Sequence, residues 1–380
     1  MKKKYIIFFI VTLVLLVALI TSFNYFKTTN AYIDDSVNNQ TKITKGISMN
    51  LEQTAGAGDY KTVTRSSWPT EGYKFNAELS RCENGSTLSW DDTKKAVIVS
   101  GNLSDKCYVY FDIYQPTLAE YIKSQYTGTQ GDNGIYYHNS TLANGAGDNS
   151  YRYAGASDSV NNYICLGSDA ATCPDANLFR IIGVFGNQTK VIRAKSVGDK
   201  QWHTSQVNTW SSSSLNTYLN GEYLTSLGTL KNKIATTTWK VGGGSWSNIV
   251  NSVPKTVYQY EVGSSASTTT VDKKIGLMYV TDYYYSASPS AWTLVGFDND
   301  ATKDYRAAKT TNWLYLGSYE WTISRFSDTA ISVFGVSSTG FVSGYDVTNS
   351  YAVRPSFNLE SSVKYVSGSG SMSDPVRVTD

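Results

Sequence analysis

The segment from Asn312 to Leu359 restricts the possible fold more than any other part of the chain. Its centre, Ala330–Val342, reads as two strands joined by a turn, between an aromatic strand that ends at Glu320-Trp321-Thr322 and a closing strand at Tyr351–Pro355. Glycine, serine and asparagine suit the turns, while β-branched and aromatic residues supply the apolar faces of the strands. The segment predicts a β-rich architecture, and we recognise no catalytic arrangement in it.

The N-terminus indicates export. Three lysines, Lys2–Lys4, precede an uncharged run at residues 5–26 that is rich in Ile, Phe, Val and Leu. About 20 apolar residues cross a bilayer, and lysines ahead of them favour a cytoplasmic N-terminus. We therefore expect a cytoplasmic tail at residues 1–4, a transmembrane anchor at 5–26 and an extracellular remainder of the chain. The alternative is a signal peptide cleaved near Thr29-Asn30-Ala31, which leaves a secreted protein.

The four cysteines fit an oxidising compartment. Cys82 and Cys107 bracket a β-rich segment, and Cys165 and Cys173 bracket a short loop. Four cysteines allow three pairings, and we predict disulfides between the sequence neighbours. A zinc site is the weaker interpretation, because neither pair has the spacing of zinc ligands and neither histidine of the chain lies beside them.

The composition argues against nucleic-acid binding and in favour of a surface ligand. The formal net charge is +2, and Lys and Arg are scattered singly, without a basic patch after the N-terminal lysines. Only 17% of the residues are charged, whereas 29 Tyr and 9 Trp are present. Aromatic faces among hydroxyl and amide groups suit sugars and peptides. We expect the partner to be a glycan or a protein at the cell surface.

The pattern of elements predicts two folded regions behind a linker. Residues 27–60 are polar and read as a linker or stalk. Residues 61–113 read as a small β domain that needs its disulfide, because so short a region buries little core. Residues 114–380 combine helical and strand patterns with long loops, which indicates a mixed α+β domain. Its clearest patterns are helices at 117–126 and 215–227, a hairpin at 178–194 and a buried strand at 275–280.

Five short motifs mark this larger region: Trp210-x-x-Ser213-x-Leu215, Lys274–Met278, Trp321-Thr322-x-Ser324, Ser338–Val342 and Val353-Arg354-Pro355. Together they resemble an uncharacterised domain of surface proteins from Gram-positive bacteria (Firmicutes). That domain is distantly similar to the C-type-lectin-like fold, as in formylglycine-generating enzymes and in the display proteins of diversity-generating retroelements. The resemblance implies an α+β, C-type-lectin-like domain with long loops.

The resemblance also implies a binding face at the C-terminal turns. The display proteins carry variable residues on a hairpin surface, which corresponds here to residues 325–328 and 344–349. The candidate ligand-binding residues are Trp321, Arg325, Phe326, Asp328, Tyr345, Asp346 and Asn349. The calcium motifs of sugar lectins do not occur, and no cysteine follows Cys173, although formylglycine-generating enzymes need a cysteine pair in their C-terminal half. We therefore assign no catalytic residue, metal ligand or cofactor.

Two polar segments have simple structural interpretations. Asp298–Asp304 imitates the start of a calcium loop, but it lacks the glycine and the glutamate of that motif. We expect an ordinary acidic turn there. Gly242–Gly244 is not followed by the residues of a phosphate-binding loop, so we expect a flexible turn.

The remaining single residues also favour structural roles. A catalytic relay would need His138 or His203, and we expect both to be solvated in loops. Arg354 has apolar neighbours, which predicts a partly buried guanidinium paired with a carboxylate such as Glu320 or Asp328.

Two functions of different classes follow from the sequence. The first is a membrane-tethered, non-enzymatic surface protein that binds a ligand or acts in adhesion. The alternative is a cell-envelope hydrolase of peptidoglycan or another glycan, with carboxylates such as Glu222, Glu320 or Asp282. A structural spacer protein of the envelope is the third interpretation.

Overall fold

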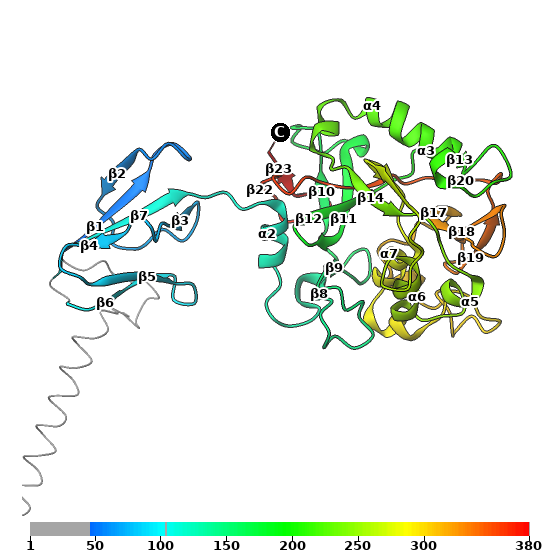
Figure 1. The fold of residues 1–380 in the computed structure, drawn as a ribbon, viewed down its shortest axis with the longest axis horizontal. Helices are drawn as coiled ribbons and strands as arrows, with labels where there is room; N and C mark the ends of the chain where they lie inside the picture. Colours follow the sequence, from blue (N-terminus) through cyan, green and yellow to red (C-terminus); the bar gives the residue numbers. More distant parts are fainter. Residues whose placement is uncertain (1–45, 103–104, 380) are drawn as a thin grey trace, which may run out of the picture. The chain divides into compact units, whose positions relative to one another are not determined.

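The computed structural model of the chain describes residues 46–102 and 105–379. They form an N-terminal unit that ends at Gln115 and a C-terminal unit that begins at Pro116 (Figure 1). The run at 5–26, which was predicted to be an anchor or a signal peptide, lies outside the described residues. In the described ranges, every helix is too short or too polar to cross a membrane.

The N-terminal unit is a small sheet with a separate hairpin. Its central pair is parallel, with Met49 of β1 opposite Val109 of β7, and this register points Met49, Leu51 and Phe111 into one apolar cluster with Trp68. The sheet order is β2-β1-β7-β3, with β4 also paired to β7, while β5 and β6 form the hairpin. The strands are β1 (Ile47–Glu52), β2 (Tyr60–Val63), β3 (Tyr73–Phe75), β4 (Arg81–Cys82), β5 (Thr87–Asp91), β6 (Ala96–Ser100) and β7 (Cys107–Ile113).

This unit differs from the prediction at its N-terminal boundary. The range 27–60 was predicted to be a linker, but Ile47–Glu52 is a central strand of the sheet. The sequence did not reveal β1, because its partner β7 lies far along the chain and a parallel pairing leaves no local turn signal. The predicted disulfide between Cys82 and Cys107 is confirmed, and it joins the paired strands β4 and β7.

The C-terminal unit is built on two sheets that share one apolar core. In the larger sheet, the order is β16-β21-β12-β11-β9-β8, and β10 pairs with β11 on the edge opposite β12. The hairpin predicted at 178–194 is confirmed as β11 and β12, whose strands are buried on both faces. The strands are β8 (Ile135–Tyr137), β9 (Tyr151–Tyr153), β10 (Tyr163–Cys165), β11 (Leu178–Phe185), β12 (Gln188–Arg193), β16 (Ile275–Gly276) and β21 (Ser356–Asn358).

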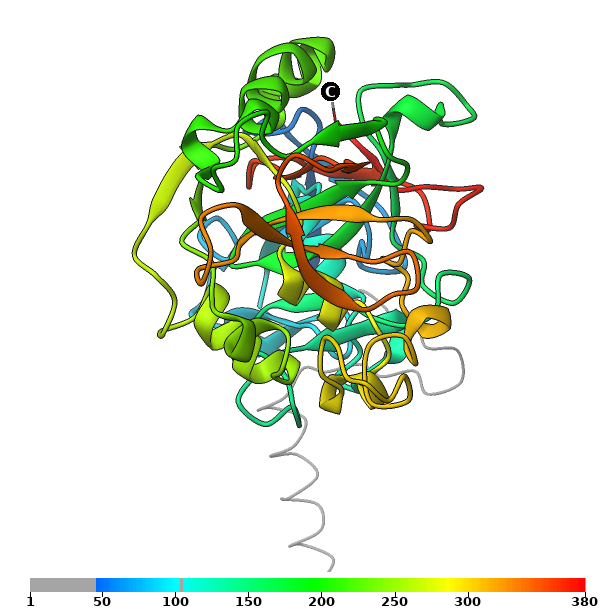
Figure 2. The ribbon, with the colours of Figure 1, turned by 90° about the vertical axis from the view of Figure 1, so that its right-hand side faces the viewer.

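The second sheet contains most of the segment from Asn312 to Leu359. The predicted two-stranded turn is confirmed as the antiparallel pair β18 and β19, and these strands lie toward the viewer in Figure 2. The sheet order is β13-β20-β17-β18-β19. Its strands are β13 (Asp199–Gln201), β17 (Glu320–Arg325), β18 (Ser332–Val336), β19 (Val342–Asp346) and β20 (Ser350–Ala352). Two further two-stranded sheets pair β14 (Thr237–Lys240) with β15 (Thr270–Lys273) and β22 (Tyr365–Ser367) with β23 (Arg377–Val378).

Short helices connect these strands. The first, α2, lies within the range 117–126 that was predicted to be helical, and it begins with a capping box between Thr117 and Glu120. Its backbone meets the far end of the chain, because the Leu118 N–H donates to the Val363 carbonyl at 2.8 Å. The helices are α2 (Leu118–Ser124), α3 (Ser214–Tyr218), the π-helical η4 (Leu219–Tyr223), α4 (Leu224–Ser226), α5 (Trp246–Ile249), α6 (Pro254–Glu261) and α7 (Val280–Tyr285), with 3₁₀ turns η1 (Asp132–Gly134), η2 (Asp175–Asn177), η3 (Trp210–Ser212), η5 (Gly228–Lys233), η6 (Pro289–Thr293) and η7 (Lys309–Thr311).

The predicted fold class, an α+β C-type-lectin-like domain behind a transmembrane helix, is contradicted. Strands make up 32% of the structure and helices 18%, and the described helices include none that could span a bilayer.

The buried strand predicted at 275–280 is shorter than expected. Only Ile275–Gly276 is a strand, because carboxylates end the extended chain by accepting backbone N–H groups at the start of α7. Asp282 accepts from Tyr279 at 2.7 Å, and Glu261 accepts from Val280 at 2.9 Å.

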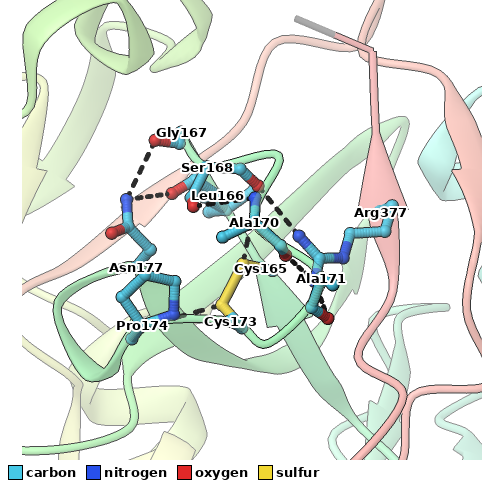
Figure 3. The surroundings of a disulfide bond; sticks show 10 residues. All are labelled: Cys165, Leu166, Gly167, Ser168, Ala170, Ala171, Cys173, Pro174, Asn177 and Arg377. Atoms are coloured by element: carbon cyan, nitrogen blue, oxygen red, sulfur yellow. Dashed lines mark hydrogen bonds between the residues drawn. A yellow bond between two sulfur atoms is a disulfide. The ribbon is translucent and has the colours of Figure 1, made fainter.

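The second predicted disulfide, between Cys165 and Cys173, is also confirmed. It closes a loop whose carbonyl oxygens face the C-terminal strand β23 (Figure 3). Arg377 donates hydrogen bonds to the carbonyls of Ser168 and Ala170, both at 2.8 Å. The disulfide therefore holds a loop to which the last strand is bound.

Candidate functional site

The C-terminal unit contains a cavity of about 260 Å³ between the larger sheet, the strand β14 and the helices α6 and α7. Charged side chains from β9, β12 and α7 form one part of its lining, and aromatic side chains form another part. We call it the aromatic cavity, and α6, α7 and β14 can be followed in Figure 1. The residues that line it are Asp148, Arg152, Phe185, Gln188, Lys190, Thr237, Thr238, Trp239, Lys240, Tyr258, Val262, Tyr279, Thr281, Asp282 and Asn358.

Asp282 is the central carboxylate of the cavity. Its Oδ2 atom accepts hydrogen bonds from Lys190 Nζ at 2.5 Å and from the Tyr279 N–H at 2.7 Å. Its Oδ1 atom lies 3.9 Å from Arg152 Nη1. The position of Asp282 in the first turn of α7 fixes this carboxylate, and the two cations come to it from neighbouring regions of the larger sheet.

A second carboxylate holds Arg152 from the other side. Arg152 Nη2 donates to Asp148 Oδ2 at 2.6 Å, and its Nε donates to the Ser150 hydroxyl at 2.8 Å. Arg152 and Asp282 are each 3% exposed, and Lys190 is 5% exposed. Four charged groups therefore meet at a buried place, which is uncommon unless each charge has a partner.

The surroundings lower the pKa values of both Lys190 and Asp148, for different reasons. Burial lowers the pKa of Lys190, and the nearby Arg152 lowers it further, although Asp282 opposes the change. Burial by itself raises the pKa of Asp148, but Arg152 and the hydrogen bonds from Ser150 outweigh it and lower the pKa to about 2. Asp148 therefore remains ionised at physiological pH.

Aromatic rings surround the two cations. Lys190 Nζ lies 4.6 Å from the centre of the Tyr279 ring and 5.3 Å from that of Trp239, while the Arg152 guanidinium lies 4.7 Å from the Phe185 ring. These distances are within the range of cation–π attraction. The ring of Trp239 packs flat on the backbone of Gly276, where an added Cβ would come within 2.9 Å of the ring. Glycine there allows the tryptophan to reach its place.

His138 differs from its prediction as a solvated loop residue, because it is completely buried. Its Nδ1 atom accepts the Ala146 N–H at 3.1 Å, so the ring proton lies on Nε2. Burial, together with the charge of Arg152, lowers the pKa of His138 well below 6.5. The ring packs against Tyr285 and Trp292, with ring centres at 4.7 and 5.2 Å. His138 is therefore neutral and supports the region behind Arg152.

The structure places the candidate residues of β17 and its following turn outside the aromatic cavity. Trp321 is buried and donates from Nε1 to the Lys200 carbonyl at 2.8 Å. Phe326 packs on Phe334, and Asp328 accepts the Trp246 N–H at 2.9 Å. Arg325 is half-buried, and its Nε has no hydrogen-bond partner among the described residues.

The other three candidates lie on and after β19. Asp346 accepts hydrogen bonds from the backbone and hydroxyl of Thr348, at 2.9 and 2.6 Å, and Asn349 is exposed. Tyr345 packs edge-on against Tyr319 and Tyr351, with ring centres at 5.6 and 5.4 Å. None of the seven described candidates lines the cavity, and most of them are engaged in local turns and packing.

Arg354 and Glu320 form a closed ion pair elsewhere in the unit. Arg354 donates to both carboxylate oxygens, at 2.7 and 2.8 Å, and to the Leu314 carbonyl at 2.5 Å. Of the two carboxylates considered for Arg354, the structure thus joins it to Glu320. Glu222, another carboxylate considered for hydrolysis, is exposed on the π-helical turn η4.

Two other segments have clear structural roles. In the acidic turn 298–304, Arg306 donates to both oxygens of Asp304 and to the Asp298 carbonyl, so the carboxylate of Asp304 is paired within the protein. The Gly242–Gly244 run, predicted to be flexible, is instead tightly packed. A Cβ added at Gly243 would lie 1.8 Å from the Arg325 carbonyl oxygen, so only glycine fits there.

Sequence reasoning named Asp282 but missed Arg152 and Lys190. A usable signal exists for Arg152, which interrupts the aromatic run Tyr151-Arg152-Tyr153, whereas Lys190 follows the polar residues Gln188 and Thr189 and carries no such signal. A charged residue at the centre of such a run predicts a buried partner of opposite sign. The sequence contained no information on which carboxylate that partner is.

One family of known proteins is similar to part of this unit. Residues 186–361 match the Domain of unknown function (DUF6273). The matched segment contains Lys190, Trp239 and Asp282, whereas Asp148 and Arg152 precede it. No curated protein and no solved structure matches the chain. The chain is thus similar over this segment to a family without an assigned function, and its cavity has to be interpreted from its own chemistry.

Proposed function

We propose that the C-terminal unit is a non-enzymatic binding domain outside the plasma membrane, and that its aromatic cavity receives one unit of a glycan. The observation that carries this proposal is the meeting of three buried charged groups and the partly buried Asp148 with aromatic walls in one cavity. Buried ion pairs often stabilise a fold no better than apolar residues of similar size. Such a cluster in a cavity is therefore a candidate for ligand recognition.

The chemistry of the cavity suits a sugar. Lys190 and Arg152 can donate hydrogen bonds to hydroxyl oxygens, while Asp282 Oδ1 can accept one. The flat faces of Trp239, Tyr279 and Tyr258 offer apolar area for the C–H face of a ring. The volume of about 260 Å³ is slightly smaller than that of sites for drug-sized ligands, which suits a single hexose.

The disulfides support a location outside the membrane. Both pairs of cysteines are joined, and such bonds persist mainly in oxidising compartments. The lysine-flanked apolar run at 5–26 supplies a reason for export. Surface display or secretion would bring the domain to extracellular glycans.

Binding is favoured over hydrolysis by the state of the carboxylates. A glycosidase needs one carboxyl group with a raised pKa to act as an acid, but the pKa of Asp148 is lowered to about 2. Asp282 forms an ion pair with Lys190, and both carboxylate oxygens of Glu320 accept hydrogen bonds from Arg354. The pKa of Glu261 is raised by burial, but its carboxylate does not line the cavity. These groups hold charges in place and have no evident route for proton transfer.

A glycan array probed with the full-length oxidised protein tests this proposal. Tyr258→Ala removes a half-buried wall of the cavity, and Phe326→Ala removes a half-buried ring near the C-terminal turns. We expect the first variant to lose the array signal and the second to keep it. The reverse result would move the site to the C-terminal turns, and release of reducing ends from a bound glycan would replace binding by hydrolysis.

A further inference from the structure

The hydrogen bonds of the cavity leave donors unused and acceptors mostly occupied. Asp148 Oδ1 accepts the N–H and hydroxyl of Ser150, at 3.1 and 2.5 Å, and Oδ2 accepts from Arg152. Asp282 Oδ2 accepts from Lys190 and from the Tyr279 N–H. Of the four carboxylate oxygens, Asp282 Oδ1 alone receives no hydrogen bond from a described residue.

Lys190 and Arg152 both have N–H donors without a described acceptor. An ammonium group carries three N–H donors and a guanidinium five, yet Asp282 Oδ2 is the one described acceptor for Lys190 Nζ. Arg152 uses Nε and Nη2, while its Nη1 has no described acceptor and lies 3.9 Å from Asp282 Oδ1. Both side chains line the cavity and are at least 95% buried. A buried cation with unused donors requires an acceptor, and a bound ligand can supply it.

The unused donors lie near one another. Lys190 approaches one oxygen of the Asp282 carboxylate, and Arg152 Nη1 faces the other oxygen. Both cations also lie beside the Phe185 ring, at 5.9 and 4.7 Å from its centre. Lys190 Nζ and Arg152 Nη1 flank the two oxygens of Asp282. The carboxylate of a ligand has the same distance between its oxygens, so the same two donor groups can flank it as well.

The net charge of the cavity permits an added anion. Arg152 and Lys190 balance Asp148 and Asp282, and Lys240, which also lines the cavity, adds a further positive charge. Lys240 Nζ donates to the Gly263 carbonyl at 3.0 Å, and no carboxylate among the described residues forms an ion pair with it. One additional negative charge would therefore make the lining neutral.

We propose that the glycan unit is acidic, a hexose bearing a carboxylate that accepts hydrogen bonds from Lys190 Nζ and Arg152 Nη1. This inference rests on the proposed glycan binding and specifies its substrate class. The aromatic walls then contact the sugar ring, and Asp282 Oδ1 accepts a hydrogen bond from a ring hydroxyl. A cationic sugar meets two cations in the same place and is excluded.

Three sugars with the same ring test the charge preference on the unmodified full-length protein. Glucuronate, glucose and glucosamine carry a carboxylate, a neutral hydroxymethyl and an ammonium group, respectively, and ligand-observed NMR titration gives their dissociation constants. We expect glucuronate to bind at least tenfold more tightly than glucose, and glucosamine to bind most weakly. Equal binding of glucose and glucuronate would overturn the acidic preference and leave glycan binding intact. Failure of all three sugars to bind would overturn both proposals.

Two lysine variants locate the preference. Lys190→Met removes the proposed partner of the carboxylate, and Lys195→Met removes an exposed lysine of the same region, whose side chain is 60% exposed. The first variant should lose the preference for glucuronate over glucose, and the second should retain it. If folded Lys190→Met, checked by circular dichroism, keeps the tenfold preference, the carboxylate does not lie at Lys190 and the inference is wrong. If that variant does not fold, the three-sugar comparison on the unmodified protein decides.

Discussion

One buried ion pair and one buried ion cluster of the C-terminal unit are similarly buried but differ in their hydrogen bonding. The Arg354–Glu320 pair is closed, since the guanidinium satisfies both carboxylate oxygens and a backbone carbonyl. The cluster of Arg152, Lys190 and Asp282 opens into a cavity and keeps unused donors. Burial of charge alone therefore does not separate the two, and the unused hydrogen-bonding capacity of the cluster is the difference on which our proposal of a ligand site depends.

The largest expected effect comes from breaking the closed pair. Arg354→Met leaves Glu320, 1% exposed, without its partner and without access to a cavity. We expect the free energy of unfolding to fall by about 3–5 kcal/mol, as for other buried pairs that lose one member, and urea unfolding measures it. The double variant with Glu320→Leu should recover much of the loss. A loss no larger than that of an exposed pair would show that the pair is not closed.

Breaking the open cluster should cost less. In Lys190→Met, the Asp282 carboxylate keeps the Tyr279 N–H and faces a cavity that water can enter. We expect a loss of about 1–3 kcal/mol in urea unfolding, together with loss of acidic-sugar binding. A loss equal to that of Arg354→Met would erase the contrast between the two pairs.

The pH dependence of stability probes the positive field behind the cavity. His138 is neutral in the fold with its pKa lowered well below 6.5, so the unfolded chain takes up a proton first as the pH falls. Stability from this group is present above pH 6.5 and should fall below it by up to about 1.4 kcal/mol per pH unit. His138→Gln should flatten this slope in urea unfolding between pH 6.5 and 5, while His203→Gln, on a partly exposed turn, should keep it. An unchanged slope in His138→Gln would assign it to other groups.

The smallest effect is expected for an ion pair at the surface. Lys195 and Asp175 lie 2.6 Å apart with side chains 60% and 63% exposed. Lys195→Met should change the free energy of unfolding by about 0–1 kcal/mol, and sugar binding should not change. A larger loss would mean that distance, and not burial, governs the cost in this protein.

Local patterns predicted the local parts of this fold. The pairs β11–β12 and β18–β19 follow from turn residues and strand composition, and α2 follows from apolar residues at helical spacing, each within a few residues of one another. The two disulfides follow from pairing each cysteine with its neighbour in the sequence. Each of these signals lies in one short stretch of the sequence.

The cavity could not be predicted in the same way, because its parts are distant in the chain. Arg152, Lys190, Trp239, Tyr258 and Asp282 come from five different elements. Their meeting depends on strand order and on the packing of α6 and α7, and neither leaves a periodic signal. The resemblance directed attention to the C-terminal turns, whereas the buried charges lie elsewhere.

The hydrogen bonds between the first and last elements of the C-terminal unit have a consequence for its synthesis. Leu118 bonds to Val363, Cys165 to Val376, and Arg377 to the disulfide-closed loop. The helix α2, the strand β10 and the disulfide-closed loop therefore lack these partners until residues 363–377 have left the ribosome. We expect the unit to fold after translation of this stretch, so that nascent chains stalled before residue 360 remain protease-sensitive however long they are held.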